Sequence, residues 1–316
     1  MSPNAAALPD PCLAAAPTSA QRPGACSLHV AAISARPHLW ALPGIVPAAL
    51  LPSRLVPPAA ALSPLRLHVL GGIALHGAAD AVAADRLLAQ PKVVALLAYL
   101  ALAAAGRPAR YQRRDRLVGL LWPELDQPHA RGALRKAVHA ARGVLGADAL
   151  LSRGDEEVAL AEGALWCDAV AFGESEEAGQ LARALELYAG ELLPGFHLPE
   201  CAEFGRWLDD VRAELRERAA GAAWAHAAYL ADGDQLTEAG RWARRAVRYA
   251  WDDERALRRA LVLLDRLGDR AGALRLYDEF GRRLRAEYDA EPSRETAALG
   301  AALRVGAPLP APVARR

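Results

Sequence analysis

Basic side chains recur at helical spacing between residues 129 and 145, in the segment HARGALRKAVHAARGVL. At about 100° per residue, a helix places four of them on a strip about 80° wide. These four residues are Arg131, Arg135, His139 and Arg142. Lys136 flanks the strip, and no acidic residue occurs between His129 and Ala147. Arginine can donate two hydrogen bonds to guanine in the major groove or bind phosphates. The spacing therefore predicts a helix that contacts double-stranded DNA.

The same segment carries an apolar stripe that would bind the helix to a core. It consists of Ala130, Leu134, Ala137, Val138, Ala141 and Leu145. Asp126 is a good candidate for the N-cap, and Gly146 is placed to end the helix. A charged strip can also be a merely solvated face. However, the absence of acids within the segment removes the ion pairs that such faces usually contain.

The residues before this helix predict a second basic cluster. Arg113, Arg114 and Arg116 lie before and within a short helix, about Arg113 to Leu121, that Trp122-Pro123 closes. Arg110 precedes the same helix. In a helix-turn-helix this helix crosses the DNA backbone, so the four arginines are expected to contact phosphates. Arg153 lies at the tip of a hairpin over residues 150–160 and is expected to contact DNA as part of a wing.

The surrounding elements complete a winged helix-turn-helix over residues 65–162. Alternating apolar residues predict two short strands over residues 65–76, around Gly71-Gly72. Apolar residues at helical spacing predict a helix from Pro91 to Leu102. Strands, three helices and a terminal hairpin follow one another in that order.

A repeat of 34 residues occurs in the C-terminal half. The pattern that begins at Ala239 and contains Trp242 and Ala246 returns from Ala273 to Phe280. A Gly-Asp pair precedes each copy, at 233–234 and 268–269. This period is typical of tetratricopeptide helix pairs, which stack to form a protein-binding surface. We expect an all-α helical-repeat domain over residues 165–305, although an ordinary helical bundle would give a similar pattern. The fold class predicted for the whole chain is mainly α.

Charge is distributed unevenly along the 316 residues, although the net charge is only +1. Residues 65–150 carry a net charge of +6 and residues 151–316 a net charge of −7. A basic segment followed by an acidic one predicts a part that faces a polyanion and a part that does not. Residues 1–64 are rich in alanine and proline, and we expect a disordered leader there and a disordered tail over 306–316.

Several classes of protein are excluded or disfavoured. The sequence contains no Gly-Lys dipeptide, so the phosphate-binding loop of many nucleotide-binding proteins is missing. It has no G-x-S-x-G motif, so the nucleophile turn of α/β-hydrolases is missing as well. The four cysteines form no C-x-x-C pair, and His197 and Cys201 are expected in a loop and at a helix start. We expect no catalytic residue, no metal and no cofactor. The longest apolar run, 93–105, is shorter than a membrane span, so a cytoplasmic protein without membrane contact is expected.

The chain resembles a known family of bacterial regulators. The run from Asp115 to Pro123, followed by the run from Ala130 to Arg135, is similar to the winged helix of Streptomyces antibiotic regulatory proteins (SARPs). The runs 192–196, 274–287 and 291–296 resemble the bacterial transcriptional activator domain. The resemblance covers about residues 65–305. It implies an activator that binds direct repeats near a promoter as a homo-oligomer and recruits RNA polymerase.

An alternative is a protein–protein adaptor whose winged helix no longer binds DNA. Gly132 and Gly143 lie inside the predicted DNA-contacting helix, and each lowers helix stability by about 1 kcal/mol relative to alanine. Ala141 stands where the family usually has a leucine. The arginine strip without acids favours DNA binding over this alternative.

Overall fold

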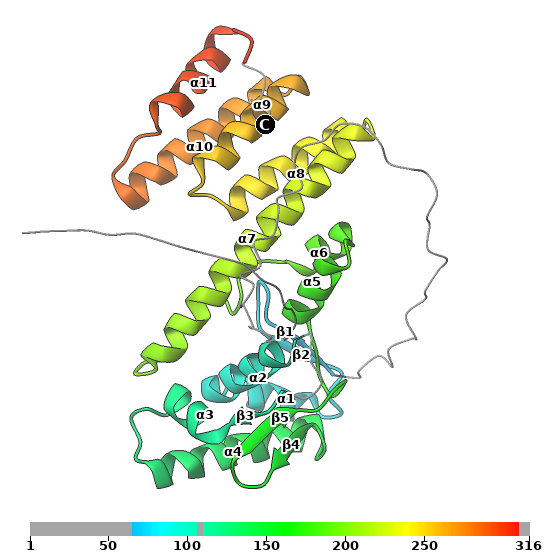
Figure 1. Ribbon diagram of the computed structural model, residues 1–316, viewed down its shortest axis with the longest axis vertical. Helices are drawn as coiled ribbons and strands as arrows, with labels where there is room; N and C mark the ends of the chain where they lie inside the picture. The colour runs from blue at the N-terminus through cyan, green and yellow to red at the C-terminus, as the bar shows by residue number, and fades with distance from the viewer. Residues whose placement is uncertain (1–64, 106–109, 310–316) are drawn as a thin grey trace, which may run out of the picture. The chain divides into compact units, whose positions relative to one another are not determined.

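A computed structural model describes residues 65–105 and 110–309 (Figure 1). The expected leader, residues 1–64, and the last residues, 310–316, lie outside the described residues. The first four residues of the expected tail are described, and they contact the rest of the chain. Arg270 donates a hydrogen bond to the carbonyl oxygen of Ala307, and Leu309 packs against the helical core.

The described chain begins with a small sheet. Strands β1 (Arg66–His68) and β2 (Ala74–His76) pair antiparallel, and β6 (Trp166–Cys167) pairs parallel with β1. Gly71 lies in the turn between β1 and β2 with φ of +75°, and a Cβ there would lie 2.9 Å from the Ala189 carbonyl carbon. The turn therefore depends on glycine for its conformation and for its close approach to a later part of the chain.

Four helices and a second sheet follow. The helices are α1 (Ala81–Leu88), α2 (Pro91–Ala104), α3 (Arg114–Leu121) and α4 (Gln127–Leu145). The sheet has the order β3 (Gln112–Arg113), β5 (Glu157–Leu160), β4 (Leu150–Arg153), with both pairs antiparallel. Residues Val93 to Ala101 of α2 are buried throughout, so this helix forms the centre of the core. The winged helix-turn-helix predicted from the sequence is confirmed, with one additional helix, α1, that the sequence pattern did not predict.

Between residues 165 and 309, seven helices make up the C-terminal part. They are α5 (Asp168–Glu177), α6 (Leu181–Leu187), α7 (Ala202–Asp232), α8 (Leu236–Tyr249), α9 (Glu254–Arg266), α10 (Arg270–Tyr288) and α11 (Arg294–Val305). The domain expected to be all-α over residues 165–305 begins with a strand instead, because Trp166 and Cys167 pair with β1. Residues 189–201 form no helix, which agrees with the loop expected at His197.

The 34-residue repeat corresponds to equivalent helices of two consecutive pairs. Its copies lie in α8 and α10, which follow α7 and α9 respectively. The repeated positions Ala239 and Ala273 are both fully buried, as are the small residues Ala243 and Ala246. Each preceding turn contains a left-handed residue, Asp234 in the first and Gly268 in the second. Small side chains at these positions let paired helices approach closely, as expected for a helical repeat.

A buried carboxylate connects the two parts of the chain. Asp168, the first residue of α5, accepts hydrogen bonds from the backbone N–H groups of Val69 and Leu70, at 2.9 to 3.1 Å. It also accepts one from its neighbour Ala169. The end of β1 is thereby fixed to the start of the C-terminal helices.

No single described helix has the length and hydropathy to cross a membrane. Helices α1 and α2 reach the required values only as a pair, and that pair is bent by 94°.

Candidate nucleic-acid interface

Helix α4 has the boundaries and the buried stripe that the sequence predicts. Asp126 caps it by accepting a hydrogen bond from the backbone N–H of His129 at 3.0 Å, and Gly146 follows its last residue. All six residues of the predicted apolar stripe are buried. Because one face is fixed in the core, the side chains on the other face are presented outward.

Three predicted DNA-contacting residues lie on that outward face. Arg135, Lys136 and His139 are exposed. The side chains of these three residues have no hydrogen-bond or ion-pair partner among residues 65–105 and 110–309. A surface of α4 with two unpaired cations and an imidazole can donate hydrogen bonds to base edges or phosphates.

Arg131 is engaged with a residue of the preceding helix. Its Nε and Nη2 atoms donate to Oδ1 of Asp115 on α3, at 3.1 and 2.7 Å. The hydrogen bond with Arg131 lowers the pKa of Asp115, and the same contact raises the pKa of Arg131. The partner could not be inferred from α4 alone, because it lies 16 residues earlier in the chain.

Arg142 and Arg114 meet at the wing. Arg142 donates through Nε to the carbonyl oxygen of Leu150 at 3.0 Å and through Nη2 to Oγ of Ser152 at 3.0 Å. Arg114 donates to the same Oγ at 3.1 Å. Both guanidinium groups therefore bind β4 and position the wing against α3 and α4. Sequence reasoning missed Ser152, whose position opposite these arginines becomes visible only in the fold.

The environment of Arg114 is strongly positive. Burial lowers its pKa, nearby Asp155 raises it, and the charges of Arg142, Arg135 and Arg131 lower it again. The Nε atom of Arg114 is buried without a hydrogen-bond partner among the described residues. Since arginine remains protonated in proteins, these groups concentrate positive charge between α3, α4 and the wing.

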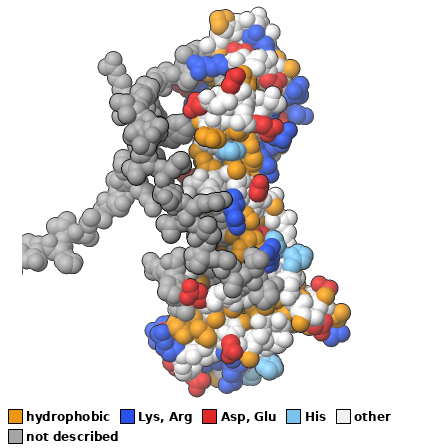
Figure 2. Space-filling view, turned by 90° about the vertical axis from the view of Figure 1, so that its right-hand side faces the viewer, with side chains coloured by type: hydrophobic (Ala, Val, Ile, Leu, Met, Phe, Trp, Pro, Cys, Tyr) orange, Lys and Arg blue, Asp and Glu red, His pale blue; other side chains and the backbone are white. Residues whose placement is uncertain are grey.

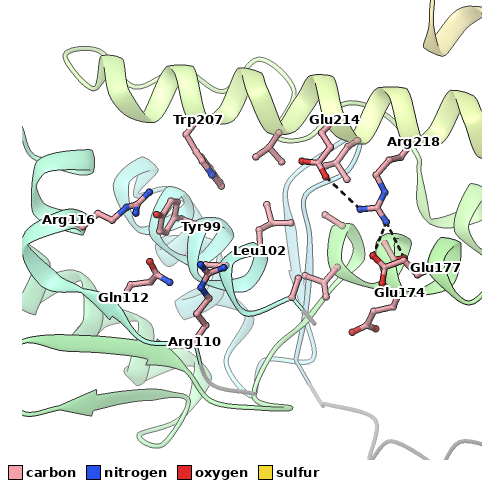
Figure 3. Close-up of a pocket in the computed structure, with 17 residues that line it drawn as sticks. Tyr99, Leu102, Arg110, Gln112, Arg116, Glu174, Glu177, Trp207, Glu214 and Arg218 are labelled. Atoms are coloured by element: carbon pink, nitrogen blue, oxygen red, sulfur yellow. Dashed lines mark hydrogen bonds and ion pairs between the residues drawn. The ribbon is translucent and has the colours of Figure 1, made fainter. Parts of the chain in front are cut away.

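The other predicted residues lie apart from this cluster. Arg113 is exposed on β3, where it is paired in register with Glu157. Arg153 is exposed on the wing, forms an ion pair with Glu157 at 3.2 Å and lies 3.9 Å from the ring centre of Tyr111. Arg116 is exposed but lines a pocket against α7, and so does Arg110. Figure 3 shows both near Tyr99.

His197 and Cys201 lie where the sequence places them. Cys201 precedes the first residue of α7, and His197 lies in the loop before it, as predicted. Within the part of the chain that the structure describes, no group of three metal-ligating side chains comes together.

Comparison with known proteins gives a family and a similar fold. Residues 160–304 match the family described as bacterial transcriptional activator domain (BTAD). The structure of Mycobacterium tuberculosis EmbR in complex with a low-affinity phosphopeptide is similar, with a TM-score of 0.50 and 18% sequence identity. The similarity covers 78% of this chain and 66% of EmbR, slightly less than two thirds of that protein. A search of curated proteins gave no match.

The domain match includes the C-terminal helices from α5 through most of α11, and the likeness to EmbR extends to the winged-helix elements. Residues 160–304 therefore match a bacterial transcriptional activator domain, and the fold of the described chain is similar to that of EmbR.

Proposed function

We propose that this protein is a transcriptional activator that binds double-stranded DNA by placing α4 in the major groove. The observation that carries the proposal is the outward face of α4, where Arg135, Lys136 and His139 are exposed and unpaired among the described residues. A helix that is buried on one face and basic on the other has the geometry of a recognition helix.

The remaining arginines would have two kinds of role. Arg113 and Arg153 are exposed on either side of β5 and are placed to contact phosphates. Arg131, Arg142 and Arg114 would mainly fix the positions of α3, α4 and the wing while adding positive charge. Arg116 would contribute through long-range attraction, since its side chain lines the pocket against α7.

The helical-repeat part would recruit RNA polymerase and join neighbouring protomers on direct repeats of DNA. Over these helices, basic and acidic side chains are interspersed on the face drawn in Figure 2, which suits protein contact better than contact with a polyanion. Two exposed aromatic residues, Tyr229 and Tyr288, lie on α7 and α10. Tyrosine is enriched in protein interfaces, which supports a role of these helices in assembly.

Fluorescence anisotropy with DNA from upstream of the protein's own gene tests this proposal. The wild type, Arg135→Ala and the control Arg86→Ala should be titrated at several salt concentrations, with random DNA as a second ligand. We expect Arg135→Ala to weaken binding by about 10-fold or more if it removes a bidentate base contact. Arg86 lies on α1, is exposed, and should be replaceable without such a loss.

A second function, a protein–protein adaptor, is favoured by one observation. Two of the four strip residues, Arg131 and Arg142, use their guanidinium groups within the protein. Fewer cations are then free for DNA. Binding that is weak, equal for both DNA ligands and unaffected by Arg135→Ala would support the adaptor and contradict the activator.

A further inference from the structure

A pocket of about 400 Å³ lies between the winged-helix elements and helices α5 and α7 (Figure 3). Its volume falls within the range of small-molecule binding sites in proteins. Tyr99 and Leu102 of α2 form one wall, and Trp207 and Leu215 of α7 form another. The rings of Tyr99 and Trp207 are 4.9 Å apart between centroids. The pocket thus offers an aromatic and aliphatic surface, in which the two rings are tilted by 59° to each other.

The side chain of Gln112 adds an unpaired amide to the pocket. Gln112 on β3 lines the pocket and is only 8% exposed. Its side chain makes no hydrogen bond with any residue in the described ranges. An unpaired amide in the lining of a pocket can donate and accept hydrogen bonds, so it is suited to bind a polar group there.

Two arginines lie at the same end of the pocket. Figure 3 shows Arg110, Gln112 and Arg116 around the ring of Tyr99. Neither guanidinium group has an ion-pair partner among residues 65–105 and 110–309. The end is therefore rich in donors and positive charge, which matches a carboxylate.

The opposite end of the pocket has a different character. Glu177 and Glu214 lie 3.5 and 3.9 Å from Arg218, which occupies this end together with Glu174. Figure 3 shows these four side chains apart from the cluster around Tyr99. An anion is consequently attracted to one end only, and its apolar body would extend along the wall between the two ends.

We propose that this pocket binds a small aromatic carboxylate, with the carboxylate held by Arg110, Arg116 and Gln112 and the ring against Tyr99 and Trp207. The occupant would contact β3, which leads directly into α3, and also α7 of the activator domain. Its binding would therefore change the affinity for DNA. This second step rests on the proposed DNA-binding function, whereas the ligand site does not.

Calorimetric titration of the full chain with 2-naphthoate, without DNA, tests the site. We expect saturable binding with a Kd of about 1 mM or lower, as for a ligand of this size. The neutral isostere 2-naphthamide should bind at least about 10-fold more weakly, because it lacks the charge that the arginines recognise. Arg110→Gln and Arg116→Gln should each weaken naphthoate binding by about 10-fold, and Gln112→Leu should weaken it less.

Arg86→Gln is the control for the loss of one positive charge and should bind naphthoate as the wild type does. Arg110 and Arg116 are exposed, so the thermal unfolding of the variants should match that of the wild type. Equal binding of the acid and the amide, no saturable binding, or unchanged affinity in both arginine variants would overturn the proposal. Naphthoate binding by a chain that fails to bind DNA would support the pocket and refute the proposed function separately.

Discussion

The guanidinium group of Arg131 on α4 binds the carboxylate of Asp115 on α3, with Nη2 2.7 Å from Oδ1. The contact joins the two helices of the helix-turn-helix and partly neutralises one cation of the strip. The two side chains are 36% and 48% exposed, so the ion pair itself contributes little to stability.

Replacement of Asp115 by alanine should strengthen DNA binding. The change frees Arg131 and removes a negative charge from the surface that faces the phosphates, so anisotropy titrations should give a lower Kd. The free energy of unfolding in urea should change little, because the ion pair is exposed to solvent. Weaker DNA binding by a variant of normal stability would mean that this face does not meet DNA.

Replacement of Arg142 by glutamine should affect stability more than the salt dependence of DNA binding. The half-buried guanidinium group donates to Leu150 and Ser152, and its loss leaves the Leu150 carbonyl oxygen without this donor. We expect a loss of about 1 to 2 kcal/mol in the free energy of unfolding. If Arg142 instead binds a phosphate, the variant will keep its stability, and its plot of log K against log salt will be shallower by about 0.9 than that of the wild type.

Replacement of Gly143 by alanine should stabilise the protein. A Cβ at this helical position would meet no atom within 4 Å, and alanine is favoured over glycine in helices by about 1 kcal/mol. Urea unfolding should show a gain of about 0.5 to 1 kcal/mol. The contrasting variant is Gly71→Ala, where φ is +75° and the new Cβ would lie 2.9 Å from a carbonyl carbon. That variant should be destabilised, and a gain there or a loss at Gly143 would contradict the backbone described above.

Replacement of Glu254 by glutamine should reduce stability at neutral pH but not in acid. Burial raises the pKa of Glu254, but hydrogen bonds from Ser293 and Thr296 and the charge of Arg258 outweigh this and lower the pKa below 4.5. The ionised carboxylate therefore stabilises the fold above the pKa of the unfolded chain, and this contribution disappears as the pH falls through the lower folded-state pKa.

The measurement for Glu254 is urea unfolding of wild type and Glu254→Gln at pH 7 and at successively lower pH. We expect a difference of about 1 to 2 kcal/mol at pH 7, which should shrink once the pH is below 4.5. The neighbouring acid Glu295 is the control, because its side chain is 79% exposed. A difference that does not change with pH would show that the charge of Glu254 is not what fixes α11 to α9.

The sequence was sufficient to predict α4 because local signals define it. Asp126 and Gly146 mark its ends, and the six-residue apolar stripe determines which face is buried. The partners of its arginines were not predictable in this way. Asp115 and Ser152 belong to other elements, and only the packing of α3 and β4 against α4 brings them within hydrogen-bond distance.

Short elements were missed for a related reason. Strand β3 has only the two residues Gln112 and Arg113, and strand β6 has two as well, so neither shows an alternating pattern. Each forms because it pairs with a strand that is distant in the sequence: β3 pairs with β5, and β6 pairs with β1. The pocket and the burial of Gln112 depend on these pairings and on α7, so no local pattern indicated them.

The most direct test of DNA recognition by α4 is a competition measurement of sequence preference. The ratio of affinities for the cognate upstream DNA and for random DNA should be compared between Arg135→Ala and Arg113→Ala. We predict that Arg135→Ala lowers the ratio by about 10-fold or more, because base contacts specify sequence. Arg113→Ala should weaken both affinities equally, because phosphate contacts do not distinguish one DNA sequence from another. An unchanged ratio in Arg135→Ala, with the wild type preferring its cognate DNA, would contradict the assignment of α4 as the recognition helix.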